Sequence, residues 1–427
     1  MVTRSSLRDS DSARQTSHSF RIALNAAACS PLECESLCDT AYDLPESLEH
    51  LPMNRFFLGN FDFEEQLRGE VQRPVRLERL VLELASSWLA IADASDRIWC
   101  PGRLPGEFLT SLVQWGLPAD LFVAETRHIP AGLELVPWGW SPAAVEFGER
   151  NGLVVNAPPL DVVRLANSRE YSVPLEEPPT DDWSYGTLCR KLGEVLACIE
   201  RLPPSTSWVI KANWSHAARE RILGRGPVIS NSEIQWVKQR IARDGVVSWE
   251  LWLQREAEIG IQWEIPSSGQ APQLVAITEL LVDTRGQYAG TRQLPPNVAF
   301  FSEKGRPFSE KKATPEDWAR EAAEATRPVI NDLAQRGYFG PVGIDAMRYF
   351  DPEFEISRTR TLQDINARWT MGRLAAGWFE RLRVERPVTW SHGPLPVLDA
   401  ATGSVEPIAT SPGQIDNIPV AHRTWLK

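Results

Sequence analysis

Two stretches near the C-terminal end bring together side chains that bind cations and anions. They are Gly337-Tyr-Phe-Gly-Pro-Val-Gly-Ile-Asp345 and Leu362-Gln-Asp-Ile-Asn-Ala-Arg-Trp-Thr-Met-Gly372. Asp364, Asn366 and Arg368 stand at alternate positions in the second stretch, so in a β-strand they project from one face. Carboxylate and amide oxygens are hard ligands that suit Mg²⁺, and a guanidinium suits an anion. The combination predicts a site for magnesium-bound polyphosphate.

A hairpin is needed to bring the two stretches together. Residues 342–350 and 361–369 are expected to be strands, and a turn-like segment around Glu355 separates them. Antiparallel pairing of the two strands places Asp345 opposite the region of Asp364 and Asn366. The alternative is that acidic and amide residues near strand ends cap turns, and that an arginine beside an aspartate forms a surface ion pair.

The order of these pieces resembles the C-terminal half of the ATP-grasp superfamily. More narrowly, it is similar to the carboxylate–amine ligases that carry a pre-ATP-grasp domain. The resemblance covers about residues 160–385 and is weaker over residues 53–159. It implies that Asp345, Asp364 and Asn366 hold the magnesium of Mg·ATP, although this chain has aspartate at 364 where glutamate is usual. The shorter side chain moves the metal or weakens one ligand.

The resemblance also implies residues that contact the nucleotide. Lys211 ends the strand Trp208-Val-Ile-Lys, and the polar, basic segment after it corresponds to the mobile loop that covers the phosphates. That loop is poorer in glycine and richer in arginine than family loops usually are. Arg169 is the nearest match to a basic residue, more often lysine, that contacts phosphate. Glu256 or Glu258 would bind the ribose, and the sequence leaves open which of them does so.

Two further arginines complete the implied catalytic set. Arg292 follows a buried strand at a place where an arginine commonly faces the transferring phosphate or the substrate carboxylate. Arg368, in the same predicted strand as Asp364 and Asn366, would orient the carboxylate and stabilise the charge that develops. The alternative for Arg292 is a solvated charge at a strand end.

The fold implied by the resemblance is α/β (α+β), with an ATP-grasp fold preceded by a small Rossmann-like pre-ATP-grasp domain. We expect four segments: a disordered or poorly structured N-terminal extension over 1–52, a pre-ATP-grasp α/β domain over 53–159, an ATP-grasp domain over 160–385 (lid about 169–245, catalytic half about 246–385), and an extended C-terminal segment over 386–427. The first folded segment lacks the glycine pattern Gly-x-Gly-x-x-Gly, so no dinucleotide is assigned to it.

Composition limits the classes of partner. The 427 residues carry a net charge of −11 with a pI near 5.3, which argues against nucleic acid or an anionic membrane as the main partner. No apolar run approaches the roughly 20 residues that span a bilayer. The six cysteines include no Cys-x-x-Cys pair and no secretion signal accompanies them, so reduced thiols and a cytoplasmic location are expected.

The sequence therefore predicts an ATP-dependent ligase with ATP and Mg²⁺ as cofactors. A substrate carboxylate would attack the γ-phosphate to give an acylphosphate, and an amine or similar nucleophile would then displace phosphate. The predicted partners are a small-molecule carboxylate and an amine-type acceptor, with no nucleic acid and no membrane. A non-catalytic nucleotide-binding module with the same fold is the main alternative, and a scaffold that binds no nucleotide is another. Neither the two substrates nor the oligomeric state can be read from the sequence.

Overall fold

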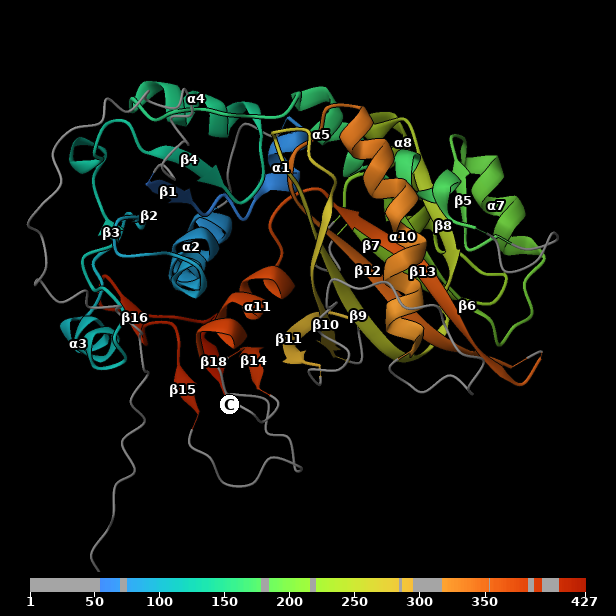
Figure 1. Cartoon of the computed structure of the whole chain (residues 1–427). Coiled ribbons are helices and arrows are strands. Elements are labelled where there is room, and N and C mark those ends of the chain that lie inside the picture. The colour runs from blue at the N-terminus through green and yellow to red at the C-terminus, as the bar shows by residue number, and fades with distance from the viewer. Residues whose placement is uncertain are drawn as a thin grey trace, which may run out of the picture.

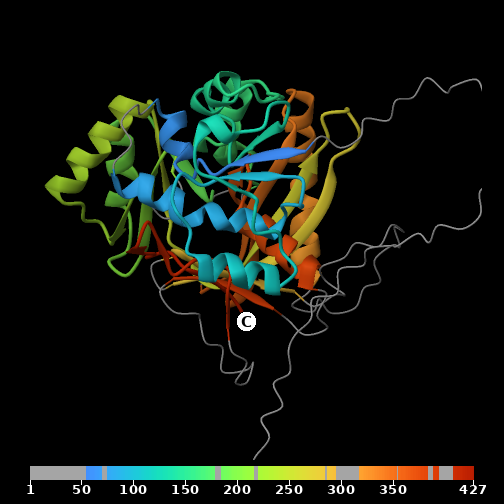
Figure 2. The same ribbon diagram turned by 90° about the vertical axis from the view of Figure 1, so that its left-hand side faces the viewer.

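The structure is a computed structural model that describes most of the chain beyond residue 53. The described residues are 54–69, 75–177, 184–215, 220–283, 286–294, 317–352, 354–382, 388–393 and 407–427. The predicted N-terminal extension over 1–52 lies outside them. Figure 1 shows a smaller N-terminal part beside a larger β-rich part, and Figure 2 shows the N-terminal part from the front.

The N-terminal part is a four-stranded parallel sheet with helices around it. The strands lie in the order β3-β2-β1-β4. Their bounds are β1 (Arg55–Leu58), β2 (Arg97–Trp99), β3 (Phe122–Val123) and β4 (Glu134–Pro137). The helices are α1 (Phe63–Leu67), α2 (Val75–Leu84), α3 (Gly106–Gln114) and α4 (Pro142–Arg150). Parallel strands joined through helices confirm the predicted α/β character of this segment.

The middle of the chain forms a small antiparallel sheet covered by two helices. The strand order is β5-β8-β6-β7, with bounds β5 (Gly186–Cys189), β6 (Ser207–Ala212), β7 (Arg221–Arg225) and β8 (Val247–Leu251). Trp208 and Ile210 pack with residues of α7 (Leu192–Glu200) and α8 (Asn231–Asp244). Since strand side chains alternate, Val209 and Lys211 face the other way. Helix α8 begins with a capping box formed by Ser230 and Glu233.

The large sheet has eight strands in the order β13-β12-β9-β10-β11-β14-β18-β15, and its paired neighbours are antiparallel. Its long strands are β9 (Gln254–Ile265), β10 (Gln273–Val282), β11 (Tyr288–Gln293), β12 (Gly340–Asp351) and β13 (Ile356–Asn366). Helix α10 (Asp317–Gln335) covers one face, where Nε1 of Trp263 donates to Oγ1 of Thr326 at 3.1 Å. Gln262 points to the other face and accepts a hydrogen bond from Thr370, just before α11 (Met371–Leu382).

The hairpin of β12 and β13 was predicted from the sequence, and the structure confirms it. The strands pair in antiparallel register with Asp345 opposite Asp364, and Glu355 turns the chain with a φ of 52°. The second strand ends at Asn366 rather than Trp369, because the backbone N–H of Ala367 binds the side chain of Asn167 and that of Arg368 binds the carbonyl of Asn366. Arg368 therefore stands beyond the strand and is not placed by strand alternation.

Two short helices lead from the N-terminal part into the small sheet, α5 (Leu160–Ala166) and α6 (Arg169–Ser172). The C-terminal segment, predicted to be extended, adds strands to the large sheet. Strands β14 (Thr389–His392) and β18 (Thr424–Leu426) pair with each other, and β15 (Ile408–Ala409) pairs with β18. A hairpin of β16 (Gln414–Ile415) and β17 (Ile418–Pro419) lies between them in the chain.

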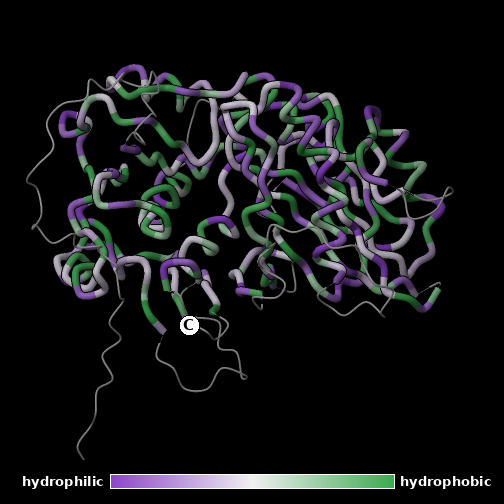
Figure 3. Tube along the Cα trace, in the orientation of Figure 1, coloured by the Kyte–Doolittle hydropathy of each residue, from purple (hydrophilic) through white to green (hydrophobic). Residues whose placement is uncertain are grey.

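Hydrophobic and hydrophilic residues alternate along most elements, as Figure 3 shows. This is the pattern expected when one face of each element is buried and the other is solvated. In the described ranges no helix is both long and apolar enough to cross a bilayer.

Candidate active site

A cavity of about 430 Å³ lies where the three parts of the molecule meet. The small sheet contributes Val209 and Lys211, the large sheet contributes Asp345 and Asp364, and Trp138 comes from the N-terminal part. The volume is in the range of small-molecule sites, in which apolar walls carry a few polar groups that fix the ligand. The cavity is therefore the candidate active site.

Carboxylates from adjacent strands meet on the floor of this cavity. Asp345 lies directly opposite Asp364 across the β12–β13 pair, and Nδ2 of Asn366 donates to Oδ2 of Asp345 at 3.4 Å. Burial, together with the negative charges of Asp364 and Glu258, raises the pKa of Asp345 to about 7. The structure thus brings together the three predicted magnesium ligands, and it adds Glu258 to their surroundings.

A β-bulge separates Glu258 from Glu256. Arg348 pairs with Ala257 and Tyr349 with Arg255, so Glu256 is an extra residue without a partner on β12. The extra residue lets Arg255 and Glu258 share the cavity face, where Nε of Arg255 lies 2.7 Å from Oε1 of Glu258. Glu256 is exposed and pairs with Arg348 at 3.3 Å. Of the two glutamates that the sequence left open, only Glu258 lines the cavity.

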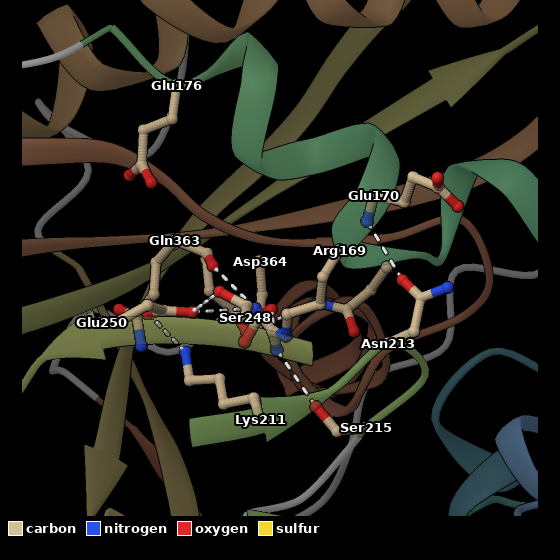
Figure 4. Close-up of polar contacts among 12 residues, drawn as sticks. Arg169, Glu170, Glu176, Lys211, Asn213, Ser215, Ser248, Glu250, Gln363 and Asp364 are labelled. Carbon is tan, nitrogen blue, oxygen red and sulfur yellow. Dashed lines mark hydrogen bonds and ion pairs between the residues drawn. The ribbon is translucent and has the colours of Figure 1, made fainter. Parts of the chain in front are cut away.

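A buried network of charges forms the wall beside the carboxylate floor, and Figure 4 shows Arg169, Lys211 and Glu250 in it close to Asp364. Nζ of Lys211 donates to Oε2 of Glu250 at 2.8 Å, and Nη1 of Arg360 donates to the same oxygen at 2.9 Å. Arg169 forms an ion pair with Asp364, and its Nη1 lies 3.7 Å from Oε1 of Glu250. Lys211 and Arg169, predicted separately as phosphate ligands, are therefore joined through Glu250 and face the carboxylate floor.

The electrostatics of this wall are strongly coupled. Burial acts to raise the pKa of Glu250, but the charges of Lys211, Arg360 and Arg169 outweigh it and hold that pKa well below its usual range. Burial lowers the pKa of Lys211, and the charge of Arg169 lowers it further. Nε of Arg169 is buried and has no hydrogen-bond partner among the described residues. Nε of Arg169 is thus a buried donor without an acceptor, and the positive charges of Arg169 and Lys211 destabilise each other. Both features favour the binding of an anionic ligand.

Arg368 is held in place by the N-terminal part of the molecule. Its Nε donates to Oε1 of Glu64 at 2.7 Å, and its Nη2 donates to Oδ1 of Asn366 at 3.0 Å. The guanidinium also lies over the ring of Trp138, 5.4 Å from the centroid. Glu64 is buried in α1, so this ion pair connects α1 to the end of β13.

The structure does not bring Arg292 into the cavity. Arg292 pairs across the sheet with Glu279, and its Nη1 lies 3.1 Å from Oε2 of that residue. Their neighbours Leu280 and Thr291 are also opposite each other, and Leu280 lines the cavity. Strand alternation therefore turns Arg292 to the other face. Arg221 of β7 and Arg255 of β9 line the cavity instead.

The opposite end of the nucleotide-sized space is apolar. Leu251, Trp252 and Leu253 join β8 of the small sheet to β9 of the large one, and they line the cavity with Val209 and Met347. Arg221 and Arg255 lie on the ring of Trp252, with centroid distances of 5.2 and 4.7 Å.

Whether this site can bind Mg²⁺ depends on the ligands other than protein side chains that the ion would have there. In the described part of the chain no group of three or more His, Cys, Asp or Glu side chains could hold a metal by itself. Mg²⁺ in nucleotide sites commonly takes one or two carboxylates and completes its shell with phosphate oxygens and water. Burial and the negative charge of Asp364 both raise the pKa of Asp345, and a cation between the two carboxylates would favour the ionised form of Asp345. The residues therefore fit Mg²⁺ bound together with polyphosphate.

The sequence alone did not single out Glu250, Arg360, Glu64, Arg221 or Arg255. The sequence contains one indication that Glu250 has a special role. Glu250 stands in the apolar strand Val246-Val-Ser-Trp-Glu-Leu251, where a buried charge needs partners. No comparable signal marks Glu64, because its partner Arg368 is 304 residues away in the chain.

No protein-family model matches the sequence, and no curated protein matches it. Several solved structures resemble the fold at 10–12% identity. The N5-carboxyaminoimidazole synthetase from Staphylococcus aureus has 11% identity and a TM-score of 0.45, with 88% of this chain and 94% of that chain covered. The biotin carboxylase domain of the Hydrogenobacter thermophilus 2-oxoglutarate carboxylase, solved with MgADP, has 11% identity and a TM-score of 0.41 over 75% and 72%.

A third similar structure comes from Archaeoglobus fulgidus and is described as a member of the ATP-grasp superfamily. It has 11% identity and a TM-score of 0.39, with 87% of this chain and 98% of that chain covered. At these TM-scores the likenesses carry no argument about chemistry, which rests on the site itself. The α/β fold is shown by the structure.

Proposed function

We propose that this chain is an ATP-dependent ligase of the ATP-grasp superfamily, which activates a small-molecule carboxylate as an acylphosphate for attack by an amine-type acceptor. The observation that carries the proposal is the meeting of acidic and basic groups in one cavity. Asp345 and Asp364 form an acidic floor, and Lys211 and Arg169 lie beside it, where Arg169 pairs with Asp364. This arrangement suits a polyphosphate whose charge is shared between a metal ion and fixed cations.

In this proposal each part of the cavity binds a different part of Mg·ATP. The apolar run at Leu251–Leu253 receives the base, and Glu258 accepts hydrogen bonds from the ribose. Lys211 and Arg169 hold phosphate oxygens, and Asp345, Asp364 and Asn366 hold Mg²⁺. When bound there, Mg²⁺ supplies positive charge that offsets the charge developing on the transferred phosphoryl group.

The chemistry proceeds in two balanced steps. A substrate carboxylate oxygen forms a bond to the γ-phosphorus while the bond to the β,γ-bridging oxygen breaks, which releases ADP. The acceptor nitrogen then bonds to the acyl carbon, inorganic phosphate leaves with the shared oxygen, and the nitrogen loses a proton. Arg368, fixed by Glu64, orients the carboxylate and stabilises the charge that develops.

The non-catalytic nucleotide-binding module remains a second candidate, because one observation favours it. Asp364, which would bind the metal, already forms an ion pair with Arg169. A metal ligand engaged by a guanidinium is a weaker ligand. The two candidates differ in one measurable property, which is turnover that depends on an acceptor.

The test measures phosphate release by the full chain with Mg·ATP and pools of amino acids and small carboxylates. The ligase proposal expects release that depends on the pool and is lost in Asp364→Asn. The matched control is Glu256→Gln, which removes an exposed carboxylate that points away from the cavity on the same sheet. Nucleotide binding in calorimetry without release in any pool would favour the non-catalytic module. Absence of both binding and release would overturn the proposal.

A further inference from the structure

The cavity continues beyond the predicted nucleotide site to an end that the ligase chemistry does not use. This end, the distal pocket, is lined by Leu80, Leu84, Leu280, Val282, Tyr288, His392 and His422. In the sheet order, β12 and β11 are separated by β9 and β10. Three strand spacings of roughly 4.8 Å place Tyr288 about 14 Å from the strand of Asp345. Tyr288 is therefore too far away to touch the reacting atoms, whereas Leu280 lies beside Gly260, the strand partner of Asp345. The distal pocket thus begins next to the predicted nucleotide site and extends to where the remote end of a substrate could reach.

The walls of the distal pocket are mainly apolar. Helix α2 provides Leu80 and Leu84, and β10 provides Leu280 and Val282. The charged groups closest to it lie at its edges. Arg255 approaches from the nucleotide side, beside Gly286, and Glu83 lies behind His422. An uncharged group is favoured here, because a charged one would lose its hydration without gaining a partner in the apolar wall.

His392 gives the distal pocket a polar anchor. Its ring is packed at steep angles against Tyr288 and Trp390, with centroid distances of 5.1 and 4.5 Å. Burial, with a smaller effect of His422, lowers the pKa of His392 to about 3, so the ring is neutral. Nε2 is buried and has no hydrogen-bond partner in the described ranges. Buried polar atoms are nearly always paired in native proteins, so this one points to a partner supplied by a ligand.

His422 lines the distal pocket and is held in position by Glu83. Oε2 of Glu83 lies 3.0 Å from Nδ1 of His422 and also accepts from its backbone N–H at 3.0 Å. The other oxygen of Glu83 accepts from the backbone N–H of Ala421 and from Arg79. The carboxylate of a helix in the N-terminal part therefore positions the C-terminal segment as a wall of the cavity.

We propose that the distal pocket binds the remote side group of one of the two small-molecule substrates, and that this group is uncharged, largely apolar and hydrogen-bonded to Nε2 of His392. A hydrophobic amino acid with an aliphatic or aromatic side chain has this chemistry. The inference rests on the proposed function for its place in a reaction, but the binding that it describes can be measured without turnover.

The test uses the full chain with Mg·ATP and a panel of leucine, phenylalanine, tyrosine, aspartate and lysine. Phosphate release and direct binding by saturation-transfer NMR are both measured for each compound. Leu80→Arg introduces a charge into the wall, and Val75→Arg is its matched control, because Val75 is an exposed residue of the same helix. His392→Phe keeps an aromatic ring and removes Nε2.

The amino acids with uncharged side chains are expected to bind, and those with charged side chains are not. Leu80→Arg should abolish this binding, and His392→Phe should raise the apparent Kd roughly tenfold, the equivalent of one hydrogen bond. The Kd of ATP and the behaviour of Val75→Arg should stay unchanged. The inference would be overturned, even if the ligase activity is found, by a preference for aspartate or lysine. It would also be overturned if neither variant altered the binding of the amino acids with uncharged side chains. Binding that Leu80→Arg abolishes would uphold it even if no phosphate is released.

Discussion

At the scale of single residues, Asp345 decides how the candidate site responds to pH. Its pKa is raised to about 7 by burial and by Asp364 and Glu258. A carboxyl group whose pKa is raised in the folded state contributes stability that is present at low pH and is lost as the pH rises through about 7. Without nucleotide, we expect the melting temperature of the wild type, measured relative to that of Asp345→Asn, to decrease as the pH rises from about 5 to about 8.

The same carboxyl group must be ionised to hold Mg²⁺. We therefore expect the increase in melting temperature caused by Mg·ATP to weaken below about pH 7 in the wild type and to be absent in Asp345→Asn. Both effects are measured in one series of thermal melts with and without Mg·ATP. If the two proteins show parallel pH profiles, Asp345 does not titrate in this range.

Glu250 is the residue whose loss should cost the most stability. It is almost fully buried and compensates the charges of Lys211, Arg360 and Arg169. Removing one partner of a buried ion pair leaves uncompensated charge and typically costs about 3–5 kcal/mol. We expect Glu250→Ala to lose free energy of unfolding of this size in chemical denaturation.

The control for Glu250→Ala is Glu256→Ala, in which an exposed ion pair is removed. A surface change of this kind typically stays within about 0.5 kcal/mol. Because the pKa of Glu250 is held low in the folded state, its contribution should be present at neutral pH and be lost only in strong acid. A loss for Glu250→Ala as small as the control would mean that the buried cations find other partners.

At the scale of elements, the bulge in β9 assigns different roles to two glutamates only two residues apart. Glu258 lines the cavity, whereas Glu256 faces solvent on the other side of the sheet. We expect Glu258→Gln to weaken ATP binding roughly tenfold, since a hydrogen bond to a charged acceptor is worth about 1.5–3 kcal/mol. Glu256→Gln should bind ATP like the wild type in titration calorimetry. Equal effects of the two changes would contradict the ribose assignment.

Strand β12 needs glycine at position 343 for a reason that lies in its neighbours. A Cβ on Gly343 would lie 2.4 Å from Cγ2 of Thr370 and 3.2 Å from Oε1 of Gln262, two side chains that line the cavity. We expect Gly343→Ala to displace both side chains and to reduce turnover at least tenfold, since small misplacements in a site are costly. The measurement is the rate of phosphate release.

The matched control is Gly193→Ala in α7, where an added Cβ has no atom within 4 Å and helix propensity favours alanine. That variant should keep its turnover and gain a little stability. If Gly343→Ala retained wild-type turnover, the close approach of Thr370 would have no functional consequence.

At the scale of the whole molecule, the C-terminal segment connects the N-terminal part to the large sheet. Strands β14 and β18 extend the sheet, and Glu83 of α2 holds the backbone and ring of His422. We expect Glu83→Ala to increase the rate of proteolytic cleavage within residues 407–427 severalfold and to weaken substrate binding in the distal pocket. Limited proteolysis followed by mass spectrometry measures the first effect.

Glu78→Ala is the control for Glu83→Ala, because Glu78 is an exposed acidic residue of the same helix. It should leave the cleavage rate unchanged. The Kd of Mg·ATP should be the same in both variants, since neither residue lines the nucleotide end of the cavity. Equal protection of the C-terminal segment in Glu83→Ala and the wild type would show that β18 alone anchors it.

The sequence by itself determined what depends on neighbours in the chain. Strand alternation and one turn are enough to pair Asp345 with Asp364, and helix α8 carries its start signal in four consecutive residues. The strand that carries Lys211 was predicted for the same reason, although it ends at Ala212 rather than at Lys211. Local spacing fixes which side chains share a face, so these features need no knowledge of the rest of the fold.

Only the tertiary structure decided what depends on contacts between distant segments. A single bulge removed Glu256 from the site, and strand register turned Arg292 to the other face, although neither effect leaves a sign in the sequence. Glu250 and Glu64 became part of the site through partners 39 and 304 residues away. The distal pocket likewise exists because α2 and the C-terminal segment meet. Burial and charge pairing are properties of the packed molecule, and they set the chemistry of side chains whose types the sequence alone supplies.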